Sequence, residues 1–244
     1  MRRAREAGVE TALGEMQGAE DGLSQRFQRL IVLQEQAANQ SALWQDVLNG
    51  WWGLIGEAEQ KGEELLAANA RGNLANTCLR LYEVTGNPAW ADQAENLFQT
   101  INQFFTREKY PQAWGIVQHS LGNLFLDRYE RSGEETQARL AEQYYQEVRQ
   151  LAQNIPLPAV FPFRACTALV RLNFRRGNWQ EVRKFSQEAR EHLEELLALQ
   201  SEQSSSESWL AEVQGLPAQT AWALLQEASP NFHQIVETLE GGRG

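Results

Sequence analysis

The chain has 244 residues, of which 22 are Lys or Arg and 32 are Asp or Glu, so its formal net charge is −10. A surface with this excess of negative charge repels a phosphate backbone, which disfavours nucleic-acid binding. Hydrophobic residues make up 42% of the chain, enough to form a core, so wholesale disorder is also disfavoured.

Cysteine usage and hydropathy indicate the cellular environment that the sequence predicts for the chain. Two cysteines, Cys78 and Cys166, are too few for a disulfide framework or, alone, for a zinc site. No apolar run approaches the roughly 20 residues of a membrane-spanning helix. The first 25 residues also lack the hydrophobic core of a signal peptide. We therefore expect a soluble, reduced, cytoplasmic protein with no membrane contact and no metal or cofactor.

The composition predicts an all-α chain, because Gln, Glu, Ala, Leu and Arg dominate and the prolines lie between helical patterns. Residues 1–20 are expected to be a flexible N-terminus. Residues 21–69 form a predicted N-terminal helical segment, with Asp21 capping an amphipathic helix over 22–39. A second helical stretch covers 41–68. Three glycines in that stretch, Gly50, Gly53 and Gly56, predict a break somewhere inside it.

A repeat with a spacing of 47 residues follows. The chain reads YEVTGNPAWADQAE at 82–95 and YERSGEETQARLAE at 129–142. Residues 74–103 and their counterparts share 11 identities in 30 positions without a gap. The identical pairs are Leu74/Leu121, Asn76/Asn123, Leu79/Leu126, Tyr82/Tyr129, Glu83/Glu130, Gly86/Gly133, Ala91/Ala138, Ala94/Ala141, Glu95/Glu142, Gln99/Gln146 and Gln103/Gln150.

Each copy is predicted to be a helix, a tight glycine turn and an antiparallel helix. Apolar residues recur at helical spacing on both sides of Gly86 and Gly133. In the first copy, Asn87-Pro88 has the chemistry of an N-cap followed by a first-turn proline. The small residues Ala94 and Ala141 are expected where the two helix backbones approach closely.

Two weaker copies are predicted further on. Residues 165–196 place a turn at Gly177, and the short distance from it to Val182 suggests a turn that has lost three residues. A fourth pair is suggested by 208–226 and 231–240. The connectors are a proline-rich stretch at 153–163 and a polar loop at 200–207. The predicted units are about 70–105, 113–152, 160–198 and 208–240, and this period with two helices per unit is typical of an α-solenoid.

The phrase Leu121-Gly122-Asn123-x-Phe125, with Gly133, Ala141 and Tyr145 after it, resembles a tetratricopeptide repeat (TPR). The segment TREKYPQAWGIVQHSLGNLFLDRY (106–129) is similar to the TPR units that precede caspase-like CHAT domains, and 211–224 and 237–244 resemble the last repeats there. The resemblance covers roughly 70–244. It implies a right-handed TPR-like solenoid of antiparallel helix pairs. The family's catalytic His and Cys have no counterpart here, so it implies the sensing or scaffolding half of a bacterial-type regulator.

Residues that could carry chemistry have simpler structural explanations. Cys78 and Cys166 fall on the apolar faces of first helices, where a thiol packs as a small hydrophobe. Adjacent glutamates such as Glu194-Glu195 point in different directions on a helix. No phosphate-binding glycine loop or HExxH motif occurs. We therefore expect no catalytic, metal or cofactor site, and no enzyme.

The eight tryptophans leave an alternative open. They could line a glycan cleft of an enzyme or binder on an α/α scaffold, acting through Trp and Glu. Packing between repeats is the simpler role for most of them, and the pair Trp51-Trp52 is the least explained. A third alternative is a structural homo-oligomer, in which exposed end repeats of different chains stack on each other.

The predicted function is protein or peptide binding by a scaffold or sensor module. In TPR arrays the first helix of each unit lines a concave groove, and the resemblance therefore implies partner contacts from the first helices here. Side-chain amides can hold a partner's backbone, and arginines can pair with its carboxylates. The partner implied by the resemblance is a caspase-like protease or its regulator. The predicted groove residues are Asn76, Arg80, His119, Asn123, Asp127, Arg164, Thr167 and Arg171.

Overall fold

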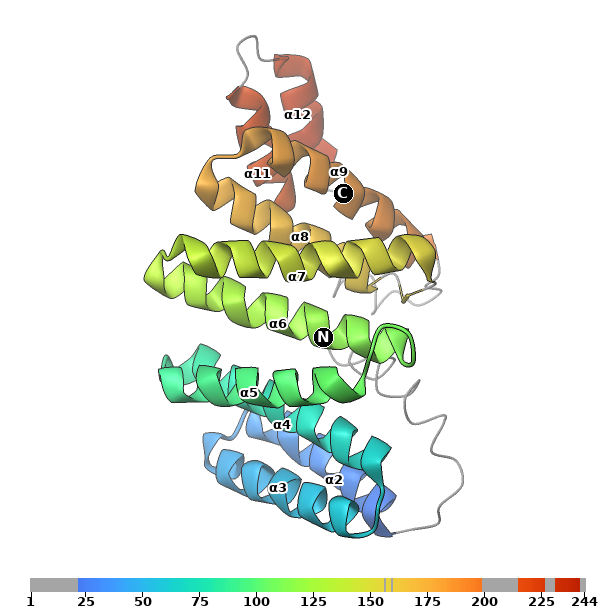
Figure 1. Ribbon diagram of the computed structural model, residues 1–244. Helices are drawn as coiled ribbons and strands as arrows, with labels where there is room; N and C mark the ends of the chain where they lie inside the picture. Colours follow the sequence, from blue (N-terminus) through green and yellow to red (C-terminus); the bar gives the residue numbers. More distant parts are fainter. Residues whose placement is uncertain (1–21, 156, 159, 199–214, 227–230, 242–244) are drawn as a thin grey trace. The chain divides into compact units, whose positions relative to one another are not determined.

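The computed structural model describes residues 22–155, 157–158, 160–198, 215–226 and 231–241. These residues form only helices, turns and short connections, so the prediction of an all-α chain is confirmed for them (Figure 1). The expectations for residues 1–20, the Asp21 cap, the loop at 200–207 and the start of the fourth pair lie outside the described residues. No helix within the described ranges combines the length and the apolar character needed to cross a bilayer.

The chain divides into two compact units, with the boundary between Asp127 and Arg128. In the first unit, neighbours along the chain pack in order, α2 on α3, α3 on α4 and α4 on α5. Amphipathic patterns drive this packing in α2, α3 and α5, which bury one apolar stripe, whereas α4 packs on both α3 and α5 and buries residues around more of its surface. The elements are α2 (Gly22–Ala37), the short 3-10 helix η1 (Ser41–Leu43), α3 (Trp44–Gln60), α4 (Glu64–Thr85), α5 (Pro88–Phe104) and the first part of α6 (Pro111–Ser132).

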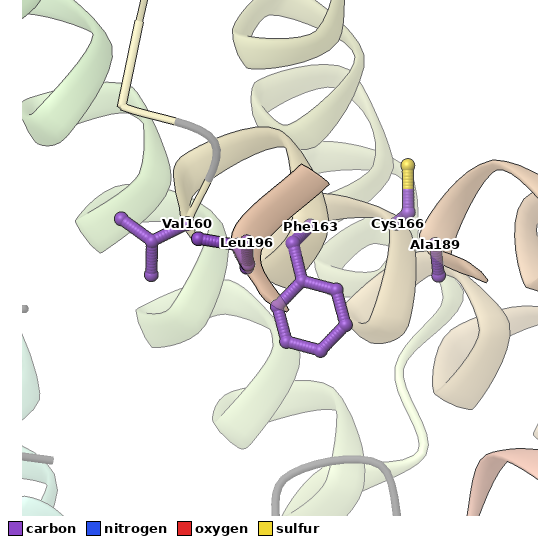
Figure 2. Close-up of a cluster of buried hydrophobic side chains, with 5 residues drawn as sticks. All are labelled: Val160, Phe163, Cys166, Ala189 and Leu196. Atoms are coloured by element: carbon purple, nitrogen blue, oxygen red, sulfur yellow. The ribbon is translucent and has the colours of Figure 1, made fainter. Parts of the chain in front are cut away.

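The second unit follows the same order of packing. α8 contacts both α7 and α9, and α11 packs on α9 and α12. Figure 2 shows part of its core, where Val160, Phe163 and Cys166 of α8 meet Ala189 and Leu196 of α9. Its elements are the end of α6, α7 (Glu135–Asn154), α8 (Val160–Arg176), α9 (Trp179–Ala198), α11 (Leu216–Leu225) and α12 (Phe232–Gly241).

The predicted break inside 41–68 is confirmed, since α3 ends at Gln60 and α4 begins at Glu64, but it does not lie at the three glycines of α3. The helix runs without interruption through Gly50 and Gly53 to Gln60, and the chain reverses at Gly62, where φ is 74°. A Cβ at Gly50 would collide with the side chain of Leu30, so this glycine allows α2 and α3 to approach closely. Packing therefore explains the glycine that the sequence suggested as a helix breaker.

The proline-rich connector is shorter than predicted. Residues 153–163 were expected to lie between helices, but α7 continues to Asn154 and α8 begins at Val160. Pro162 therefore lies in the first turn of α8. A proline is tolerated there because the first four backbone N–H groups of a helix have no partner within the helix.

The recurring Ser/Thr-Gly pairs are helix ends, as predicted. Gly86 and Gly133 adopt left-handed backbone conformations, with φ of 68° and 72°. In the first pair the hydroxyl of Thr85 accepts a hydrogen bond from the backbone N–H of Asn87 at 3.2 Å. Ser132 accepts one from the N–H of residue 134 at 3.1 Å. The hydroxyl thus bridges the glycine, which explains why Ser or Thr precedes it in both copies. The predicted N-cap is confirmed as well, because the Asn87 side chain accepts from the backbone N–H of residue 89.

The third pair keeps the same turn length, so the predicted loss of three residues is wrong. Gly177 is left-handed, with φ of 71°, and two residues separate α8 from α9, as two separate α4 from α5. The true difference is an exchange of large and small side chains. Eight and twelve residues after the glycine, the first pair has Ala94 and Phe98, whereas the third has Phe185 and Ala189. All four are buried, and the exchange roughly conserves core volume.

Two alanine substitutions of glycine are expected to have opposite effects. At Gly133 the space around a new Cβ is open, so the left-handed backbone alone should cost about 1–2 kcal/mol. At Gly56, inside α3 and also in open space, alanine should instead stabilise by about 0.5–1 kcal/mol. Urea unfolding followed by circular dichroism measures both changes. Shifts of the same sign would contradict the assignment of Gly133 as a conformational requirement.

Candidate partner-binding site

The predicted groove residues lie on three helices. In the first unit, α4 carries Asn76 and Arg80, and α6 carries His119, Asn123 and Asp127. In the second unit, α8 carries the other three, Arg164, Thr167 and Arg171. The candidates therefore form two local groups, one in each unit.

Within the first unit, the candidate amides take part in local hydrogen bonds. The hydroxyl of Ser120 on α6 donates to Oδ1 of Asn76 on α4 at 3.4 Å, which joins two helices. Nδ2 of Asn123 lies 3.4 Å from Nδ1 of His119, one turn earlier on α6. Asn76, His119 and Asn123 are all half-buried. These side chains therefore stabilise helix contacts while part of each remains exposed.

Arg80, by contrast, is exposed and pairs with Glu83 on its own helix, at 2.7 Å. An exposed pair three residues apart contributes only about 0.5 kcal/mol or less, so it constrains Arg80 weakly.

In the second unit, two arginines of α8 share one carboxylate. Nε of Arg171 lies 2.9 Å from Oε1 of Glu130, and Nε of Arg175 lies 3.6 Å from the same oxygen. Both arginine side chains are about half exposed, at 53% and 51%, whereas that of Glu130 is 20% exposed. Two guanidinium groups thus face one carboxylate, a local excess of positive charge in a chain with net charge −10.

Arg175 was not among the predicted residues, although its position one turn after Arg171 on the same helix could have suggested it. Thr167 has a local role, since its hydroxyl donates to the carbonyl oxygen of Arg164 at 3.0 Å. This bond within α8 explains Thr167 without a partner.

A more deeply buried ionic group was also not predicted. Nε of Arg149 on α7 donates to Oε2 of Glu188 on α9 at 2.8 Å, and the guanidinium lies over the Phe185 ring, 4.8 Å from its centroid. Sγ of Cys166 on α8 donates to the same carboxylate at 3.7 Å. The group connects three consecutive helices, so its role is to hold the second unit together.

The two cysteines are buried, as predicted, and burial raises the pKa of each thiol from 9.0 to about 12. A nucleophilic cysteine needs the opposite shift, toward the thiolate at neutral pH. The pairing of either cysteine with a histidine base therefore has no support from its surroundings.

Cys78 and Cys166 should consequently react with Ellman's reagent more than about 100-fold more slowly in the native protein than in 6 M guanidinium at pH 8. The unfolded thiols ionise near pH 9 and the folded ones near pH 12. The unfolded state therefore binds fewer protons between these values, so stability should fall as the pH rises above about 9. Rapid modification of the native protein would contradict the burial of the thiols.

An aromatic cluster lies at the connection between α5 and α6. The Phe104 ring stacks on Tyr110 at 5.6 Å, and Phe105 meets Tyr110 edge-on at 5.5 Å. Arg107 lies over the Trp114 ring, 5.5 Å from its centroid. Thr106 also accepts a hydrogen bond from the N–H of residue 109. These contacts pack the connection between α5 and α6 against the ends of both helices.

Trp51 and Trp52, the tryptophan pair that the sequence did not explain, have different surroundings. Trp51 is buried in the core, while Trp52 is 47% exposed and lines a surface hollow of about 410 Å3 between α3 and α5. The other residues around the hollow are Ala89, Asp92, Gln93, Asn96, Leu97 and Thr100.

Across the described part of the chain, no group of three or more His, Cys, Asp or Glu side chains is arranged to hold a metal ion. Comparison with known proteins adds no assignment, since no family model and no curated protein matches this chain.

Proposed function

We propose that this chain is a TPR-like helical-repeat module that binds a protein or peptide partner. The proposal includes a right-handed solenoid built from the successive helix pairs. Its support is the recurrence of one device, in which a helix ends at a left-handed glycine and the next helix begins two residues later, at Gly86, Gly133 and Gly177. Repeats of this kind bury their apolar faces against neighbours and leave an extended surface for binding.

The observation that carries the binding role is the pair of half-exposed arginines on α8. Arg171 and Arg175 share the single carboxylate of Glu130, so their positive charge is only partly compensated within the chain. Arginine presents a planar set of donors that matches a carboxylate in two-point contact. An acidic segment of a partner is therefore the ligand that this part of the proposed groove suits best.

The resemblance to the repeats before CHAT domains suggests which partner to test first. It favours a caspase-like protease, or a regulator of one, encoded next to this chain. In this proposal the module recruits or senses, and the partner supplies the chemistry.

A charge-reversal experiment tests the proposal. Tagged wild type, Arg171→Glu and Arg190→Glu are used to capture partners from the native host, and the product of any neighbouring caspase-like gene is tested directly. Arg190 is an exposed arginine of α9, so its reversal changes the net charge equally. We expect Arg171→Glu to weaken capture of a specific partner by about tenfold or more, and Arg190→Glu to leave it unchanged.

Circular dichroism shows whether each variant is folded before capture is compared. Equal capture by all three folded proteins would show that the α8 surface is not the binding site. Equal loss of capture in both variants would show that the effect comes from the change in net charge and not from a specific contact of Arg171.

A further inference from the structure

A second candidate surface lies on α3 and α5, where no predicted groove residue is found. The two neighbouring tryptophans of α3 differ in burial. Trp51 is buried in the core, whereas Trp52 is 47% exposed and lines a surface hollow. A single exposed apolar side chain is common on protein surfaces and carries no conclusion alone. What distinguishes Trp52 is the set of polar side chains that lines the same hollow.

One face of α5 supplies this polar wall. Asp92, Asn96 and Thr100 are spaced four residues apart, which places them in a row along the helix, and Gln93 lies beside them. Within the described part of the chain, the side-chain amides of Gln93 and Asn96 make no hydrogen bond to another residue. The Thr100 hydroxyl donates to the carbonyl oxygen of Asn96 at 2.8 Å, so its oxygen can still accept.

The chemistry of these groups restricts the class of ligand. Each amide both donates and accepts hydrogen bonds, which suits a ligand whose own groups do both. An indole offers a large flat apolar surface for an uncharged ring that is polar at its edge. A phosphate or carboxylate ligand would be repelled by Asp92 and by the net charge of −10. Asp92 already takes part in an interaction within the chain, which favours a neutral ligand over a cation that would need this carboxylate.

We propose that the hollow between Trp52 and α5 binds a neutral carbohydrate. A sugar ring would stack its C–H face on Trp52, while its hydroxyl groups would exchange hydrogen bonds with Gln93, Asn96 and Thr100. The open hollow suits the end or one face of an oligosaccharide, because its lining comes from only two helices. This site is independent of the proposed partner surface on α8, and each can fail without the other.

Titration with neutral hexasaccharides built from glucose, xylose, mannose or N-acetylglucosamine tests the proposal, with tryptophan fluorescence and calorimetry as readouts. We expect at least one of them to bind wild type, and Trp52→Ala to weaken that binding by about tenfold or more. Trp52→Phe should keep part of the affinity. The matched control is Trp222→Ala, which removes another half-exposed tryptophan, on α11, and should bind as wild type does.

The double variant Gln93→Ala/Asn96→Ala provides an independent test if Trp52→Ala does not fold, and it should also lose binding. The proposal is overturned if none of the four hexasaccharides binds at about 10 mM, a concentration that would still reveal a weak complex. Equal binding by wild type and the double variant would overturn it as well. A response to choline that depends on Trp52, without any response to sugars, would assign the hollow to cations instead.

Discussion

Replacing Trp51 with alanine should lower the free energy of unfolding by about 4 kcal/mol, whereas the same change at Trp52 should cost less than about 1 kcal/mol. The two residues are adjacent on α3 and chemically identical, so only their surroundings can produce the difference. Trp51 has no exposed surface, while nearly half of Trp52 is exposed.

The surroundings of Trp51 explain the size of the expected loss. Its ring packs edge-on against Phe27 of α2, with centroids 5.2 Å apart. Its indole Nε1–H donates to Oε1 of Gln34 on α2 at 2.9 Å, and the hydroxyl of Thr77 on α4 donates to the same oxygen at 2.8 Å. Alanine would therefore leave a large cavity where three helices meet and would remove one of two hydrogen bonds to a partly buried amide.

Urea unfolding followed by far-ultraviolet circular dichroism measures both variants without relying on tryptophan emission. Trp51→Phe should fall between wild type and Trp51→Ala, because it keeps most of the ring volume and loses the N–H donor. Similar losses at positions 51 and 52 would mean that Trp52 is also a core residue, and would weaken the proposed sugar site.

Breaking the buried ion pair of the second unit should have the next largest effect. Arg149→Met is expected to cost about 3 kcal/mol, because it leaves the Glu188 carboxylate without its guanidinium partner beside Cys166 and Phe185. The side chains of Arg149 and Glu188 are 13% and 27% exposed. The remaining access of water to Glu188 places the expected cost at the lower end of the range for fully buried pairs.

A second substitution separates the cost of an orphaned charge from the value of the pair. Arg149→Met combined with Glu188→Gln should recover more than half of the lost stability, because the unpaired charge is then gone. The control is Arg139→Met on the exposed side of α7, which should change stability by less than about 0.5 kcal/mol. A double variant as unstable as Arg149→Met would show that the arginine acts mainly by covering Phe185.

Features encoded by neighbouring residues were predictable from the sequence. The left-handed turns at Gly86, Gly133 and Gly177, the Asn87 cap and the burial of both cysteines follow from short patterns and helical spacing. Each depends on the backbone preference of a few consecutive residues or on the period of one helix, so a repeat of those residues repeats the structure.

The candidate site was predicted less completely. The sequence suggested Arg171, yet Arg175 and the shared carboxylate of Glu130 appear only once α8 is placed beside the end of α6. The hollow at Trp52 was likewise not predictable from the sequence, because its polar wall comes from α5, about 40 residues later in the chain.

Local sequence patterns are thus enough to predict the helices, the glycines at which the chain turns and the side chains on the apolar face of each helix. The packed helices are needed to see that Gly50 faces Leu30, that Trp51 and Trp52 differ in burial, and that Arg149 pairs with Glu188, 39 residues later. The physical reason is that turns and helices respond to local backbone energies, whereas these roles depend on which helix faces meet, and that choice is made by packing over the whole unit.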